Sequence, residues 1–157
     1  MKASANVTVR NLDRSCRLND KFLAKIAAKA ARLATKKGAQ LDIVFMDGRS
    51  MRRLNKRYKG SSRLTDVLSF KMGIEGDAPK RFVGAIAICP GMARKNAKVF
   101  GTRFEEELIL YVIHGILHLY GYDDMTKAER GRMSKKQSAI LRKICESGGL
   151  SKVLMPR

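Results

Sequence analysis

Cysteine is scarce in this chain and is not arranged in pairs. Cys16, Cys89 and Cys145 lie far apart, and none of them belongs to a CxxC motif. We therefore expect neither a disulfide framework nor a structural zinc site built on cysteine. This usage of cysteine is typical of a reducing compartment, and we expect a cytoplasmic protein.

Long apolar runs are also missing. Residues 1–6 lack the apolar core of a signal peptide. The longest apolar run near the centre of the chain, Leu108 to Ile113, has six residues, whereas a membrane-spanning helix needs about 20. We therefore expect no membrane-spanning helix and no membrane partner.

Acidic residues are few in comparison with basic ones. The chain has 14 Asp and Glu against 33 Lys and Arg, which gives a formal net charge of +19. A positive field of this size attracts polyanions, and the usual polyanion is nucleic acid. The alternative is a basic surface without a dedicated partner. We expect nucleic acid to be the partner.

The pattern of elements predicts one α+β domain. Apolar residues make up 45% of the 157 residues, which is enough for one substantial core, and no internal repeat is present. Periodicity predicts strands near 7–9, 41–45, 65–70 and 82–88, and helices over about 20–37, 49–59, 92–100, 103–120 and 126–145. We expect a mixed sheet of about four strands packed with about five helices in a single domain over 1–147, followed by a flexible tail over 148–157.

Both histidines of the chain lie in one short apolar stretch, His114-Gly-Ile-Leu-His118. Residues four apart lie on the same face of a helix, so both imidazoles can face one ion. Gly121 is suited to ending the helix, and Asp124 stands ten residues after His114, at the offset of the third ligand in the long zincin-type motif. Three protein ligands leave a position open for water, as in catalytic zinc sites. We predict one Zn²⁺ bound by His114, His118 and Asp124, on a buried central helix and the turn after it.

Three alternatives to this site remain open. Asp123 is a second candidate for the third ligand, in which case Asp124 supports the ligands or caps the next helix. The two histidines can also satisfy each other, or bond to the backbone, without any metal. A carboxylate ligand favours harder ions such as manganese or magnesium, so a divalent metal other than zinc is a further alternative.

The reaction class depends on what accompanies the metal. In the protease form of the motif, a glutamate directly after the first histidine acts as general base. Gly115 stands there, which disfavours a metallopeptidase. Phosphodiester hydrolysis instead needs an activated water and a cation. The basic segment 49–63 offers Arg57, Lys59 and Arg63 as substrate-binding residues, although a merely solvated basic face has the same composition.

Two motifs carry a resemblance to a known family. The stretch His114-Gly-x-Leu-His118-Leu-x-Gly-Tyr-Asp resembles the signature of the YbeY family of bacterial rRNA maturation factors. Leu54-Asn55-x-x-Tyr58 followed by Thr65-Asp-Val-Leu-Ser-Phe70 is similar to a second family motif, and the strand from Gly84 to Ile88 to a third. The resemblance extends over nearly the whole chain.

The resemblance implies a single-domain, metal-dependent endoribonuclease with a fold related to zincins. It implies zinc on His114, His118 and the residue at 124, single-strand-specific cleavage in rRNA processing (16S 3′ end maturation), ribosome quality control, and contact with the small ribosomal subunit. Protein partners stay unknown. The alternative is a non-catalytic ribosome-assembly factor with a structural metal.

Three positions depart from the family pattern. The third ligand is usually histidine, and here it is Asp124; the strand usually reads Gly-Asp, and here it reads Gly84-Ala85. The residue after Tyr58 is usually arginine, and here it is Lys59. Lysine keeps the charge but loses the bidentate grip on a phosphate. Under the resemblance, Lys59 is the candidate catalytic cation.

Overall fold

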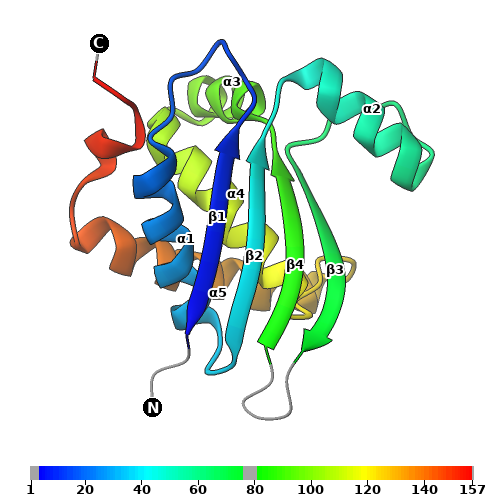
Figure 1. Cartoon of the computed structure of the whole chain (residues 1–157), viewed down its shortest axis with the longest axis vertical. Coiled ribbons are helices and arrows are strands. Elements are labelled where there is room, and N and C mark those ends of the chain that lie inside the picture. The colour runs from blue at the N-terminus through cyan, green and yellow to red at the C-terminus, as the bar shows by residue number, and fades with distance from the viewer. Residues whose placement is uncertain (1–3, 76–80, 157) are drawn as a thin grey trace.

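The computed structural model describes residues 4–75 and 81–156 of the chain (Figure 1). The elements, in chain order, are β1 (Ala5–Asn11), α1 (Asp20–Ala34), β2 (Gly38–Phe45), α2 (Gly48–Lys59), β3 (Val67–Glu75), β4 (Arg81–Ile88), α3 (Pro90–Phe100), α4 (Phe104–Leu119), α5 (Lys127–Glu146) and a short 3₁₀ helix, η1 (Leu150–Val153).

The four strands form one mixed sheet in the order β1-β2-β4-β3. β1, β2 and β4 are parallel, and β3 runs antiparallel to β4 at one edge. Helices α1, α4 and α5 lie behind the sheet in the view of Figure 1, while α2 lies near the end where β3 begins. This arrangement confirms the predicted α+β fold with four strands and five helices.

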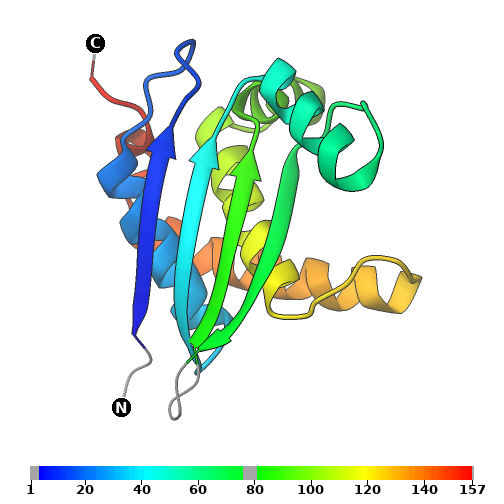
Figure 2. The same cartoon turned by 45° about the vertical axis from the view of Figure 1, so that its right-hand side comes forward.

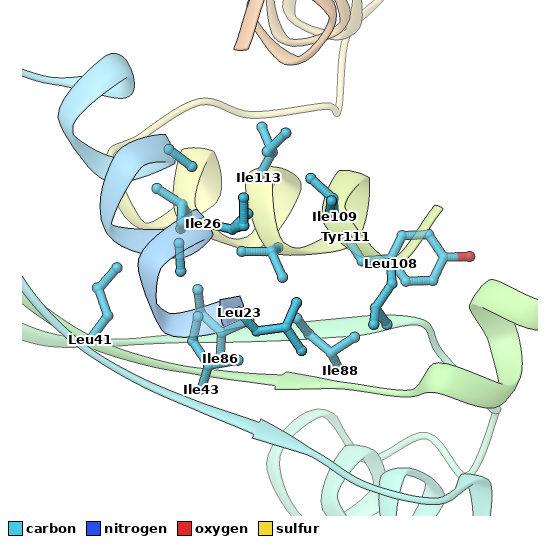
Figure 3. Close-up of a cluster of buried hydrophobic side chains, with 14 of the residues drawn as sticks. Leu23, Ile26, Leu41, Ile43, Ile86, Ile88, Leu108, Ile109, Tyr111 and Ile113 are labelled. Carbon is cyan, nitrogen blue, oxygen red and sulfur yellow. The ribbon is translucent and has the colours of Figure 1, made fainter. Parts of the chain in front are cut away.

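The main core lies between the sheet and the helices α1 and α4. Leu23 from α1, Ile43 from β2 and Ile113 from α4 are all at most 1% exposed, and Figure 3 shows such side chains meeting between the layers. Burying a side chain of this size stabilises the fold by roughly 1.5–3 kcal/mol. Helix α4 is apolar on almost every side, and it is therefore the most deeply buried helix.

Two glycines allow α4 to lie close to the sheet. A Cβ atom at Gly115 would be 2.7 Å from Cγ2 of Ile86, and a Cβ atom at Gly84 would be 2.8 Å from Cδ1 of Leu119. Real Cβ atoms essentially never come this near a neighbouring atom. Helix α4 therefore rests directly on β3 and β4, which brings its C-terminal half next to the β3 edge.

Helix α2 packs on the opposite face of the sheet, over a second cluster made of Met51, Leu68, Ala87 and Cys89. Asp47 caps its N-terminus, and the Asp47 carboxylate accepts a hydrogen bond of 2.8 Å from the Ser50 amide. This bond lowers the pKa of Asp47. The helix ends at Gly60, which has a φ of 70°, so Lys59 is its last residue.

The segment after α5 differs from the predicted flexible tail. Val153 is fully buried, the Asn19 amide donates a 2.8 Å hydrogen bond to the Val153 carbonyl, and the Met155 amide donates one of 2.8 Å to the Arg17 carbonyl. These bonds attach residues 150–155 to the segment before α1. Leu150 and Leu154 pack against the main core beside Val153, but three apolar residues in a short run are too few to predict this attachment from the sequence.

Within the described residues, none of the helices combines the length and the apolar character that crossing a membrane requires.

Candidate metal centre

Helix α4 presents its two histidines on one face, one turn apart. Nε2 of His118 lies 3.0 Å from Nε2 of His114. The two rings meet edge to face, with centroids 4.5 Å apart and planes at 79°. The Nε2 atoms therefore point at the same small region of space.

The turn after α4 brings Asp124 back to the histidines. Gly121 has a φ of 93°, and its amide donates to the His118 carbonyl at 3.1 Å while the Tyr122 amide reaches the Leu117 carbonyl at 3.0 Å. A left-handed glycine with bonds of this kind is a usual helix end. The chain then reverses, and Oδ2 of Asp124 lies 3.6 Å from Nε2 of His118.

His114, His118 and Asp124 form a group that we call the metal triad. Each offers one ligand atom, and these atoms all lie within 4.8 Å of one another. Two ligands about 2.0–2.1 Å from a tetrahedral zinc ion lie about 3.4 Å apart, which is close to the 3.0 Å and 3.6 Å separations found here. Two imidazoles and one carboxylate are a donor set of catalytic zinc sites. The residues present therefore fit a divalent metal ion, and zinc is compatible with this donor set.

The other ring nitrogen of His114 contacts α5. Nδ1 of His114 lies within hydrogen-bond distance of Oε1 of Gln137. An amide oxygen only accepts hydrogen bonds, so Nδ1 carries the proton and Nε2 keeps its lone pair. Metal-binding histidines are commonly held by such a partner.

The electrostatics of His118 favour its neutral form. Burial lowers its pKa, and the neighbouring His114 lowers it further, while Asp124 and Asp123 act in the opposite direction. A neutral imidazole is the form that ligates a metal. The site therefore holds His118 in the form suited to a ligand.

Asp123 and Asp124 are used differently by the turn. Oδ1 of Asp123 accepts a 3.0 Å hydrogen bond from the Asp124 amide, and Asp123 lines a neighbouring hollow formed by the 120–123 turn and α5. Asp124 faces the histidines. Of the two aspartates that the sequence left open, Asp124 is the one in the triad geometry.

The metal triad lines a pocket of about 530 Å³, which we call the metal pocket. Lys59 enters it from the end of α2, Asp66 from the loop before β3, and Ser69 and Lys71 from β3. Asp66 is held in place because its Oδ1 accepts a 2.8 Å hydrogen bond from the Val67 amide. The pocket thus combines a candidate metal site with two lysine side chains.

A comparison with known protein families identifies the family to which this chain belongs. The family model described as "Endoribonuclease YbeY" matches residues 6–145. This chain belongs to the YbeY family. The resemblance predicted from the two motifs is confirmed.

Individual YbeY proteins are similar over most of their length. Endoribonuclease YbeY of Elusimicrobium minutum is 34% identical over 125 residues, which cover 78% of this chain and 86% of that protein. Endoribonuclease YbeY of Staphylococcus aureus is 37% identical over 112 residues, which cover 66% of this chain and 71% of that protein. A solution structure of a Thermotoga maritima protein is 27% identical, with a TM-score of 0.62, and covers 94% of this chain and 95% of that chain.

Of the three basic residues singled out in the YbeY-like sequence, Lys59 lies in the metal pocket. Arg57 lines a separate hollow with Met46 and Leu54, and its guanidinium lies 5.9 Å from the ring centroid of Tyr58. The Arg63 carbonyl accepts a 3.0 Å hydrogen bond from Nδ2 of buried Asn55, which fixes the loop after α2. Arg57 and Arg63 are not among the described residues that line the metal pocket.

Sequence reasoning missed Asp66, Ser69, Lys71 and Gln137. Asp66 and Ser69 belong to the motif Thr65–Phe70, which carried the resemblance without an assigned role. The alternation of Val67, Ser69 and Lys71 along β3 is the signal that places them on one face. Gln137 has no such signal, because α5 reaches the site only through tertiary packing.

A hydrogen bond joins β3 to α4 at Gly115, the residue that follows His114. Oγ of Ser69 donates a 2.9 Å hydrogen bond to the Gly115 carbonyl. A side chain at 115 would run into Ile86 and Val67, so the glutamate of a zincin protease does not fit at this position. The structural reason for Gly115 is close packing.

Proposed function

We propose that this chain is a metal-dependent endoribonuclease that cleaves single-stranded RNA. The observation that carries the proposal is the metal pocket, a single cavity lined by the metal triad and by Lys59. Membership of the YbeY family and the net charge of +19 support RNA as the substrate.

In this proposal, His114, His118 and Asp124 hold one divalent ion. The ion, when bound, supplies Lewis acidity and an acidified water for attack on phosphorus. Zinc suits the two imidazoles. The carboxylate of Asp124 also admits manganese or magnesium.

The side chains around the triad bind and orient the substrate. Lys59 neutralises negative charge that develops on the scissile phosphate, which is the role of a positioned cation in phosphoryl transfer. Gln137 keeps the proton of His114 on Nδ1, so that Nε2 has the lone pair that a ligand needs. Arg57 and Arg63 are proposed to bind flanking RNA backbone outside the metal pocket, because both belong to the basic segment 49–63, Arg57 on α2 and Arg63 in the loop after it.

The cellular role proposed is maturation of ribosomal RNA, including the 3′ end of 16S rRNA, and ribosome quality control in the cytoplasm, in contact with the small ribosomal subunit. The family motifs support this role, and the positive charge suits a substrate that is largely RNA. A peptidase is disfavoured, since Gly115 leaves no space for the base.

The test compares metal content and RNA cleavage across matched variants. The purified protein should contain about one divalent ion and cleave a single-stranded RNA carrying the 16S precursor 3′ end, with an RNA duplex and DNA as comparison substrates. His114→Ala should lose cleavage. Equal cleavage by the wild type and His114→Ala would refute the assignment.

Lys59 and Arg57 provide a matched pair on the same helix. Lys59→Gln should lower kcat strongly, because Lys59 lines the metal pocket and the substitution removes its charge. Arg57→Gln removes the same charge outside the pocket and should change mainly RNA affinity. A metal-containing protein that binds RNA but leaves every RNA intact would favour the alternative, a non-catalytic assembly factor with a structural metal.

A further inference from the structure

Lys71 lies on the face of β3 that meets α4. Val67, Ser69 and Lys71 alternate along the strand, and all three line the metal pocket. The hydrogen bond from Ser69 to the Gly115 carbonyl shows that this face of β3 is the one in contact with α4. Because side chains two apart in a strand share a face, the strand directs Lys71 toward the pocket.

The pairing of β3 changes immediately after Lys71. Lys71 is paired with Gly84, and the next pair joins Gly73 to Val83, so Met72 is an extra residue in β3. Gly73 has a φ of 132°, a conformation that suits glycine. Such bulges bend a strand and redirect side chains, often beside active sites. Lys71 is thus the last regularly paired residue of β3 before the bend.

The metal pocket receives positive charge from two separate elements. Lys59 ends α2, and Lys71 stands on β3. Among residues 4–75 and 81–156, the structure gives neither lysine an ion pair. The nearby carboxylates have other contacts: Asp66 accepts from the Val67 amide, and Asp124 faces His118. Both ammonium groups are available to an anion.

The size of the metal pocket exceeds the needs of one phosphate group. At about 530 Å³ it is within the range of pockets that hold whole small molecules. Figure 2 shows α2 and the loop after α4 on the β3 side of the sheet, and β3 is the edge strand there. An extended RNA strand can therefore pass the triad along this edge.

We propose that Lys71 binds a second backbone phosphate of the RNA, next to the phosphate held at Lys59 and the metal triad. The inference rests on the proposed function and deepens it by adding a subsite. Lys71 sets the position of the RNA strand in the metal pocket. Loss of the Lys71 side chain therefore raises KM with little change in kcat. The competing explanation is that Lys71 protects the protein from aggregation, because a lysine on an edge strand discourages pairing with the sheet of another molecule.

The experiment measures RNA binding and cleavage separately. Binding of a short single-stranded RNA is titrated at several salt concentrations in the His114→Ala background, where cleavage is removed. Lys71→Ala, Lys71→Arg and Lys25→Ala are compared, because Lys25 is an exposed lysine on α1 and controls for the same loss of charge. Cleavage kinetics are measured on the metal-loaded chains with native His114.

For single-stranded nucleic acid, the loss of one phosphate contact makes the negative slope of log K against log salt less steep by about 0.7. We expect this change and a several-fold rise in KM for Lys71→Ala, near wild-type values for Lys71→Arg, and little effect from Lys25→Ala. If Lys71→Ala and Lys25→Ala behave alike, the subsite is refuted while wild-type cleavage still supports the nuclease. If the wild type does not cleave, the proposed function fails, and the salt slopes still decide whether Lys71 contacts RNA.

Discussion

Gln137 on α5 accepts a hydrogen bond from Nδ1 of His114 on α4, across 23 positions of sequence. The bond fixes the tautomer of His114 and directs Nε2 toward Nε2 of His118. The ligand geometry of the metal triad therefore depends on a helix that supplies none of the ligands.

Replacing Gln137 by methionine should weaken metal binding by about 10–100-fold, which is the usual effect of losing a partner of a ligating histidine. Gln137→Glu keeps an acceptor at Nδ1 and should retain near wild-type affinity. Competition with a chromophoric chelator measures the affinity of each chain.

Ser134→Met is the control for Gln137→Met, because it places the same side chain on an exposed position of α5. Its metal affinity should equal that of the wild type. Equal zinc affinity of Gln137→Met and Ser134→Met would show that Gln137 does not hold His114 in the form that binds the metal.

Two helical glycines should respond in opposite directions to alanine. A Cβ atom at Gly115 meets Ile86 and Val67, whereas one at Gly131 in α5 has no heavy atom within 4 Å. Overpacking costs roughly 1–3 kcal/mol, which exceeds the helix-propensity gain of about 0.8–1.0 kcal/mol. Gly115→Ala should therefore lower Tm, and Gly131→Ala should raise it.

Thermal unfolding of the two variants and the wild type provides the measurement. One kcal/mol corresponds to roughly 2–4 °C in a chain of this size. If the Gly115→Ala chain melts at or above the wild-type temperature, β3 and β4 can shift to accommodate the added methyl group. Close packing would then not explain the glycine at position 115.

The triad could be predicted because its members are local in sequence. His114, His118 and Asp124 fall within one helix and the turn that follows it, so spacing alone indicates a shared ion. The α+β fold was predictable for a similar reason, since each element carries its own periodicity.

The residues around the triad depend on tertiary packing. Arg57 and Lys59 are two apart on α2, hence about 200° apart around the helix axis. Which of them faces the metal pocket is set by how α2 packs over Met51 and Leu68. Lys71 and Gln137 likewise reach the site from β3 and α5, and local patterns do not specify where an edge strand or a final helix packs.

The metal-free protein should lose stability as the pH falls below about 6.5, partly through His118. Burial lowers the pKa of His118 in the folded chain, so the unfolded chain takes up the proton first. Below the ordinary histidine pKa of about 6.5 the unfolded state therefore binds more protons, and stability decreases. Above that pH the side chain is neutral in both states and contributes no slope.

Melting curves between pH 5 and pH 8, recorded with a chelator, test this linkage. His118→Gln lacks the titrating group, so its Tm should fall less steeply with acid than that of the wild type. Parallel curves for the two chains would show that His118 titrates alike in the folded and unfolded states.

Asp124 and Asp123 should differ sharply in their effect on metal binding. Oδ2 of Asp124 lies 3.6 Å from Nε2 of His118, whereas Asp123 bonds to the backbone of the turn. Asp124→Asn removes a charged ligand and should weaken metal binding by at least about 100-fold, beyond the effect of losing an outer partner. Asp123→Asn keeps an acceptor for the turn and should bind the metal nearly as tightly as the wild type does.

Asp124→His should shift selectivity from manganese toward zinc, because imidazole is the softer ligand. Titration of all three chains with zinc and manganese measures both effects, and an equal loss in both Asn variants would remove Asp124 from its place as third ligand.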